Sequence, residues 1–268
     1  MFIDTHCHFN FPAFVTDLDN SINHIRQAKI TGLIIPAVLA DHFNEILQLT
    51  EQYDELYAAL GLHPIYQHSP ADLEKLTAIV SEVSTHPTKL IAIGEIGLDR
   101  YDQSIEWQQQ LTFFRGQLAI AKRHDLPVLI HSRKTHDVIY HELHQANLPC
   151  RGVIHGFSGS YEQAMQFIKL GYYIGVGGVI SYARANKTRH TIAKLPLESL
   201  VLETDAPDMP LSGRQGQINR PENIVDIFNI LCQLRSEDPL LIRDTILTNT
   251  LTLFSRINKM EIPNPIKR

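Results

Sequence analysis

The chain has 268 residues, of which 44% are hydrophobic and 20% charged, and its formal net charge is −5. This composition argues against a disordered chain and is typical of a globular protein with a large core, most simply one domain over residues 1–268. The negative charge argues against a protein that coats nucleic acid by bulk electrostatics, so any phosphate binding must be local.

Eight apolar runs alternate with amphipathic segments from one end of the chain to the other. Between the first two runs, Leu18, Ile22, Ile25 and Ala28 recur at the three- and four-residue steps of a helix. This alternation of strands and helices is typical of a parallel sheet. In chain order, the predicted strands are 2–7, 33–36, 57–61, 90–94, 128–130, 152–154, 172–176 and 200–202.

Start and stop signals agree with this division. Ser69 before Pro70 predicts a helix start, Ser160 with Gln163 predicts a capping box, and Gly171 predicts a helix end. Eight strand-helix units in about 250 residues predict an α/β fold of the (β/α)8 type, a TIM barrel. A doubly wound open sheet is the alternative, but no Gly-x-Gly-x-x-Gly or Walker sequence follows the first run.

The first strand carries the most informative residues of the chain. Alternate side chains of a strand share a face, so Asp4, His6 and His8 point one way and Cys7 the other. Two imidazoles on one face predict a metal site, because neutral imidazole is a favoured ligand of Zn, Ni, Fe and Co. Cys7 is therefore a poor candidate for a ligand.

Other polar residues with metal-ligand chemistry lie at or just beyond the ends of later strands. In a barrel these ends meet at one mouth, where such folds keep their active sites. The remaining nine histidines, His86 among them, fall in helical or turn-like segments where a surface role is sufficient. The residues at the strand ends are His63, Glu95, His131, His155, Glu203 and Asp205.

These donors exceed the three or four protein ligands of one catalytic zinc, so two divalent metals are predicted. Two ions about 3.5–4 Å apart lower the pKa of a bound water and hold the attacking and leaving oxygens. Glu95 is the predicted bridging carboxylate, because its strand lies between the first strand and the fifth and sixth. Asp205 completes the ligands and takes the proton of the nucleophilic water, whereas Glu203 and Asp4 orient ligands without binding metal.

Six motifs in this order resemble the TatD family of metal-dependent hydrolases, from residue 2 to residue 254. They are FIDTHCH, ALGLHP, IGEIGLD, LIHSR, IHGFSG and LETDAP. The resemblance, strongest to a bacterial branch of that family, implies a TIM barrel and a two-metal site that hydrolyses DNA phosphodiesters. It places ligand roles on His6, His8, Glu95, His131, His155 and Asp205, and it implies a substrate-phosphate role for His63.

Basic residues near the same strand ends favour a phosphate ester over a neutral amide, because arginine binds phosphate oxygens well. The alternative is that they keep a loop-rich face soluble. Arg100, Arg133 and Arg184 are predicted to bind substrate, and Tyr101, Phe157 and Tyr182 either stack on bases or pack. The other basic residues of this group are Lys134, Lys187, Arg189, Arg214 and Arg220.

The predicted substrate is DNA, in short pieces or at single-stranded ends. Two other functions stay open: hydrolysis of an amide, lactone or aminoacyl ester by the same water, and metal binding without catalysis. Donors of this kind suit Zn, Mn, Fe, Co and, where carboxylates dominate, Mg.

The cellular location is predicted from cysteines and hydropathy. Cys7, Cys150 and Cys232 are far apart and form no Cys-x-x-Cys pair, which argues against disulfides and thiolate zinc sites. No leader is visible, and no apolar run approaches the roughly 18 residues that span a bilayer. We expect a cytoplasmic protein without a membrane association, and the sequence indicates no obligate protein partner.

Overall fold

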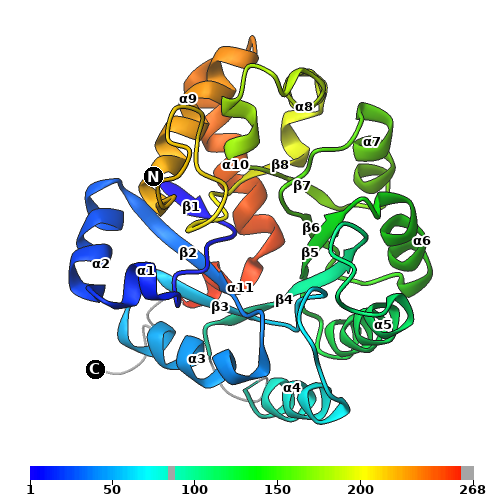
Figure 1. The fold of residues 1–268 in the computed structure, drawn as a ribbon. Coiled ribbons are helices and arrows are strands. Elements are labelled where there is room, and N and C mark those ends of the chain that lie inside the picture. Colours follow the sequence, from blue (N-terminus) through cyan, green and yellow to red (C-terminus); the bar gives the residue numbers. More distant parts are fainter. Residues whose placement is uncertain (84–87, 261–268) are drawn as a thin grey trace.

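Eight parallel strands follow one another around the sheet in chain order (Figure 1). The structure is a computed structural model, and it describes residues 1–83 and 88–260. This consecutive order confirms the TIM barrel and excludes the doubly wound sheet, in which the strand order reverses. The strands are β1 (Phe2–Asp4), β2 (Ile30–Pro36), β3 (Leu56–Leu60), β4 (Leu90–Asp99), β5 (Val128–Arg133), β6 (Gly152–Ile154), β7 (Tyr173–Val176) and β8 (Leu200–Leu202).

The barrel closes between β8 and β1, where backbone hydrogen bonds join the ends of these strands and the residues that follow them. The Thr5 N–H donates to the Leu202 carbonyl at 3.0 Å, and the Asp205 N–H donates to the His6 carbonyl at 2.9 Å. Just beyond the strands, Cys7 forms an isolated bridge with Ala206. Residues separated by about two hundred positions therefore share the same part of the mouth.

Helices form an outer ring around the strands (Figure 1). Two hydrophobic clusters result, a large one between strands and helices and a smaller one that includes Ile34, Ile91 and Val201. The helices are α1 (Pro12–Val15), α2 (Leu18–Gln27), α3 (Phe43–Gln52), α4 (Pro70–Val83), α5 (Trp107–Arg123), α6 (His136–Ala146), α7 (Tyr161–Lys169), α8 (Asn186–Lys194), α9 (Ile224–Leu234), α10 (Pro239–Leu253) and α11 (Ser255–Met260). The smaller cluster also includes Phe254, between α10 and α11, and Ile257 of α11.

Local signals in the sequence are largely confirmed. Helix α4 begins at Pro70, and Ser160 and Gln163 form the predicted capping box at the start of α7. Gly171, with a φ of 87°, follows the end of α7 in the left-handed conformation that favours glycine. Among the described helices, none has both the length and the apolar composition needed to cross a membrane.

Several strand boundaries differ from the predicted ones. Strand β1 ends at Asp4, so His6 and His8 follow the strand instead of lying within it. Strand β4 continues past Gly94 to Asp99 because its backbone pairs with β5 up to Arg133. Glu95 is therefore inside a strand, at a register irregularity, and not at a strand end.

Candidate metal centre

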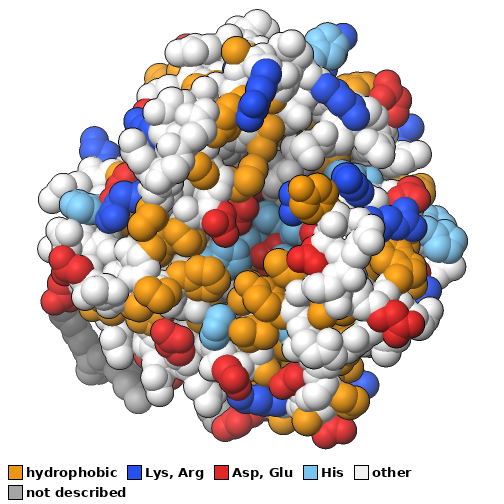
Figure 2. Space-filling model, in the orientation of Figure 1, with side chains coloured by type: hydrophobic (Ala, Val, Ile, Leu, Met, Phe, Trp, Pro, Cys, Tyr) orange, Lys and Arg blue, Asp and Glu red, His pale blue; other side chains and the backbone are white. Residues whose placement is uncertain are grey.

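Histidine and acidic side chains lie in the hollow at the centre of the barrel mouth (Figure 2). They come from several segments of the barrel, and most are almost fully buried. Glu95 is 2% exposed and stands in the middle of the group. The structure thus brings together the residues that the sequence placed at strand ends.

One oxygen of Glu95 faces the two histidines that follow β1. Its Oε2 lies 3.1 Å from Nε2 of His6 and 3.5 Å from Nε2 of His8. Asp205 approaches the same nitrogens from the end of β8, with Oδ1 at 3.6 Å from His6 and 3.7 Å from His8. These four side chains surround one position.

The other oxygen of Glu95 faces a second set of imidazoles. Its Oε1 lies 3.0 Å from Nδ1 of His131 and 2.7 Å from Nε2 of His155. His63, predicted to bind substrate phosphate, also belongs to this set, with Nε2 at 3.1 Å from the same oxygen. The two oxygens of one carboxylate thus serve two different groups of nitrogens.

Burial and charge set the protonation of the centre. Burial lowers the pKa of His6 to about 3 and that of His8 to about 4, which keeps both imidazoles neutral. Burial also disfavours charge on Glu95, yet the surrounding histidines hold its pKa well below the usual range. Burial likewise opposes charge on His155, but the neighbouring Glu95 outweighs it and raises the pKa of His155 to about 10. The centre therefore attracts positive charge.

Asp4 supports the centre through the backbone. Its Oδ1 accepts the N–H of His6 at 3.2 Å and that of Thr204 at 3.0 Å, and its Oδ2 accepts the Thr204 hydroxyl at 2.6 Å. Complete burial raises the pKa of Asp4 to about 7. Asp4 therefore fixes β1 against β8 below the histidines, and these bonds go to backbone and hydroxyl groups instead of an imidazole ring.

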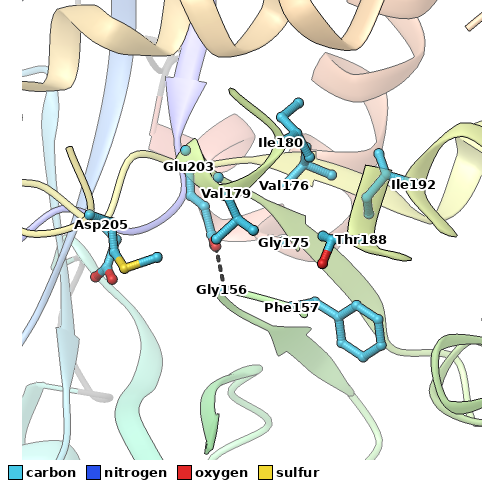
Figure 3. A pocket seen from close by; sticks show the side chains of 13 residues that line it. Gly156, Phe157, Gly175, Val176, Val179, Ile180, Thr188, Ile192, Glu203 and Asp205 are labelled. Atoms are coloured by element: carbon cyan, nitrogen blue, oxygen red, sulfur yellow. Dashed lines mark hydrogen bonds between the residues drawn. The ribbon is translucent and has the colours of Figure 1, made fainter. Parts of the chain in front are cut away.

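Glu203 lies one layer deeper than Asp205, as predicted: its side chain is fully buried, while that of Asp205 is 20% exposed. It accepts the Gly156 N–H, shown as the dashed line in Figure 3, and its Oε1 is 4.0 Å from Nδ1 of His155. Burial raises the pKa of Glu203. Gly175 makes room for this carboxylate, because a Cβ there would stand 2.4 Å from Oε2 of Glu203.

The donor set suits divalent metal ions. Buried His6, His155 and Glu203 form one group whose ligand atoms lie within 4.8 Å of one another. Nδ1 of His6, Nδ1 of His155 and Oε2 of Glu203 have no hydrogen-bond partner among the described residues. Nitrogen and carboxylate donors without thiolate are those of Zn, Mn, Fe and Co sites. Two further groups meet the same distance criterion: His6, His8 and Asp205, and His63, Glu95 and His131.

Two residues of the centre were missed by the sequence reasoning. Asp99 contacts the outer nitrogen of His131, with Oδ2 at 2.9 Å from Nε2. The signal was present, because Glu95 and Asp99 are four residues apart in one apolar run and such positions share a strand face. The second is His68, expected at the surface but only 6% exposed, whose Nε2 lies 2.8 Å from the His63 carbonyl. His86 lies outside the described residues.

The predicted substrate-binding arginines stand on the rim, outside the buried cluster. The Arg133 guanidinium lies 3.7 Å from the centre of the Tyr101 ring, which is 58% exposed. Arg184 is 5.3 Å from the Tyr182 ring. Arg100 is already engaged, with Asp137 at 3.5 Å.

The other candidates of the rim have structural contacts. Arg214 pairs with Asp226 at 2.8 Å, and Arg220 with Glu222 at 3.4 Å. Phe157 is 3% exposed and therefore packs in the core, so it offers no face to a base. Of the basic residues on this rim, Arg133 is the one whose strand also carries a histidine of the centre.

Comparisons with known proteins agree with this site. A family model described as TatD related DNase matches residues 3–255. The uncharacterized metal-dependent hydrolase YjjV of Escherichia coli is 51% identical over 95% of this chain and 98% of its own, and its crystal structure superposes with a TM-score of 0.91. An uncharacterized metal-dependent hydrolase of Haemophilus influenzae is 47% identical over 95% of this chain and 99% of its own. Human deoxyribonuclease TATDN3 is 29% identical over 96% of each chain.

Fold, donor set and relatives together define a metal-dependent hydrolase built on a TIM barrel. Within that class, the chain belongs to the TatD family.

Proposed function

We propose that the protein is a deoxyribonuclease that hydrolyses DNA phosphodiester bonds with two divalent metal ions. One observation carries the proposal: Oε2 of Glu95 faces His6 and His8, whereas its Oε1 faces His131 and His155. A carboxylate divided between two sets of nitrogens offers one oxygen to each of two ions. When bound, the ions supply a Lewis acid that lowers the pKa of water and neutralises charge on the phosphate.

The side chains of the centre then have distinct roles. His6, His8, His131, His155 and Asp205 would hold the ions, and Glu95 would be shared between them. Asp205 would also accept the proton of the attacking water, because it is the most exposed carboxylate of the group.

The substrate is held at the rim. We assign His63, which contacts Glu95 in the centre, and Arg133, two residues beyond His131, to contacts with substrate phosphates. Arg184 and Arg100 extend this basic rim. The deoxyribonuclease name of the human relative supports DNA as the substrate. With a net charge of −5, the protein is expected to bind a few nucleotides at an end or in single-stranded form.

The test is hydrolysis of short labelled single-stranded DNA with Mg²⁺, Mn²⁺ or Zn²⁺. His6→Ala and Asp205→Ala are expected to abolish release of nucleotides while far-UV circular dichroism stays unchanged. Asp54→Asn, a fully exposed side chain just before β3, is the control and should keep wild-type activity. Equal activity in both centre variants would assign the hydrolysis to a contaminant or another site.

A second candidate is hydrolysis of another bond, such as an amide, lactone or aminoacyl ester, at the same centre. The ion pairs of Arg100, Arg214 and Arg220 favour it, because they reduce the charge available for phosphate. A substrate panel with inorganic phosphate as a competitor separates the two, since phosphate should inhibit the nuclease strongly. A protein that binds both ions but hydrolyses no member of the panel would indicate a binding function.

The cysteines support a reducing compartment. Cys7 is buried, and Cys7, Cys150 and Cys232 form no disulfide among the described residues. Cysteines that form no disulfide are typical of proteins that work in the cytoplasm, which we propose as the location.

A further inference from the structure

Asp99 connects the candidate metal centre to a loop on the rim. It is the last residue of β4, and its side chain is 1% exposed. One of its oxygens, Oδ2, lies 2.9 Å from Nε2 of His131. The other, Oδ1, accepts the backbone N–H groups of Tyr101 at 2.6 Å and of Asp102 at 2.9 Å.

The contact with His131 determines which nitrogen of that ring faces the centre. Nδ1 of His131 points to Glu95 and Nε2 points to Asp99. An acceptor at Nε2 favours the tautomer that has its proton there, which leaves the lone pair of Nδ1 for a metal ion. The His131 ring thus contacts Glu95 through Nδ1 and Asp99 through Nε2.

The contact with the loop organises residues 100–105. The Asp99 N–H donates to Oε1 of Gln110 at 2.9 Å, and Nε2 of Gln110 donates to the Ile105 carbonyl at 3.2 Å. Both ends of the loop are therefore fixed to the same corner of β4 and α5. The loop presents Tyr101, whose ring carries Arg133 at 3.7 Å and Lys134 at 4.8 Å. On the rim, as far as the structure describes it, this loop brings an exposed aromatic ring together with two cationic side chains.

We propose that Asp99 is a positioning residue that holds His131 as a metal ligand and links metal binding to the order of loop 100–105. The inference rests on the proposed metal centre. Coupling between two sites is reciprocal. An ion that fixes His131 therefore stabilises the loop, and loss of the Asp99 contacts weakens the binding of the ion. The Asp99 carboxylate then orients a metal ligand and also orders the loop where substrate is expected to bind.

The first test is titration of the metal-stripped protein with Zn²⁺ by calorimetry. Asp99→Asn keeps the size of the side chain and removes its charge, and it is expected to weaken one binding step 10- to 100-fold. The matched control is Asp54→Asn, because the Asp54 side chain is fully exposed and precedes β3, at the end of the barrel opposite the mouth. An Asp99→Asn isotherm that superposes on the wild-type isotherm overturns the inference, whether the wild type binds one ion or two.

The second test needs no variant. Hydrogen exchange of the peptide that covers residues 99–105 is measured in the wild-type protein with and without Zn²⁺. The inference expects slower exchange of the Tyr101 and Asp102 amides when Zn²⁺ is bound. Unchanged exchange during saturation with Zn²⁺ overturns the link to the loop. Neither test uses DNA, so a protein that binds metal but cleaves no DNA would contradict the proposed function without touching this inference.

Discussion

A single side chain, Glu95, holds the centre together. It is the member of the cluster within 3.5 Å of all five histidines. Its position in the middle of β4 explains this reach, because β4 lies between β3 and β5, and the histidines that follow β1, β3 and β6 meet His131 of β5 around it. Removing its charge should therefore affect the whole centre and not one half of it.

Glu95→Gln is predicted to weaken both metal-binding steps by at least about 100-fold, more than is typical for residues that only orient a ligand. His8→Ala should weaken one step, because His8 faces only the Oε2 side of Glu95. Calorimetric titration with Zn²⁺ measures both. If Glu95→Gln impairs one step and spares the other, Glu95 does not bridge.

His136, which is outside the centre, should make stability depend on pH. It packs against Phe157, with ring centres 5.1 Å apart, and burial lowers the pKa of His136 to about 4. In the unfolded chain, His136 is protonated near pH 6.5, whereas in the folded protein it stays neutral down to about pH 4. Protonation therefore favours the unfolded chain. The folded protein keeps its full stability above pH 6.5 and loses stability as the pH falls toward 4. Because of His136, the free energy of unfolding falls by about 2 kcal/mol between pH 7.5 and pH 5.

The measurement is urea unfolding of metal-free protein at pH 7.5 and pH 5. His136→Gln should lose about 2 kcal/mol less than the wild type over this interval. His141→Gln, on the exposed part of the same helix, is the control and should keep the wild-type difference. Equal pH differences in all three proteins would contradict the prediction.

Among the elements, β7 is shaped by its neighbour β8. Gly175 of β7 leaves space for the Glu203 carboxylate, and a Cβ would approach Oε2 at 2.4 Å. At Gly177 a Cβ would meet Glu203 only at an ordinary 3.5 Å. Gly175→Ala is therefore predicted to cost about 1–3 kcal/mol of unfolding free energy, and Gly177→Ala less than about 1.

Chemical denaturation of the two alanine variants, side by side, measures this difference. Gly175→Ala should also weaken Zn²⁺ binding, since a displaced Glu203 moves toward His155 or loses the Gly156 N–H. Similar stability of the two variants would show that Glu203 is free to move aside.

The elements also show how far sequence reasoning reaches. The eight strands, the capping box at Ser160 and the meeting of histidines and carboxylates at one mouth were predicted, because apolar periodicity and strand alternation are local signals. The extension of β4 to Asp99 was not predicted. Its cause is pairing with β5, which no single segment reveals. His68 was missed for a similar reason: its burial depends on the loop after β3 folding back on His63.

On the scale of the whole molecule, the centre should couple metal binding to stability. An ion held by residues from β1, β4, β5, β6 and β8 binds the folded barrel and not the unfolded chain. At 100 times its Kd it adds about 2.7 kcal/mol, which raises Tm by roughly 5–10 °C in a chain of this size. Calorimetric scans with Zn²⁺ and with a chelator test this prediction. Identical Tm values would mean that the cluster binds no ion.

The junction between β1 and β8 has a consequence for synthesis. His6 and His8 leave the ribosome long before Asp205 and before the Thr204 hydroxyl that donates to Asp4. A polypeptide that ends before residue 204 therefore has these imidazoles without Asp205 and without the contact that fixes Asp4. We expect it to bind metal more weakly than the full-length chain, because the centre closes only when the segment after β8 joins β1.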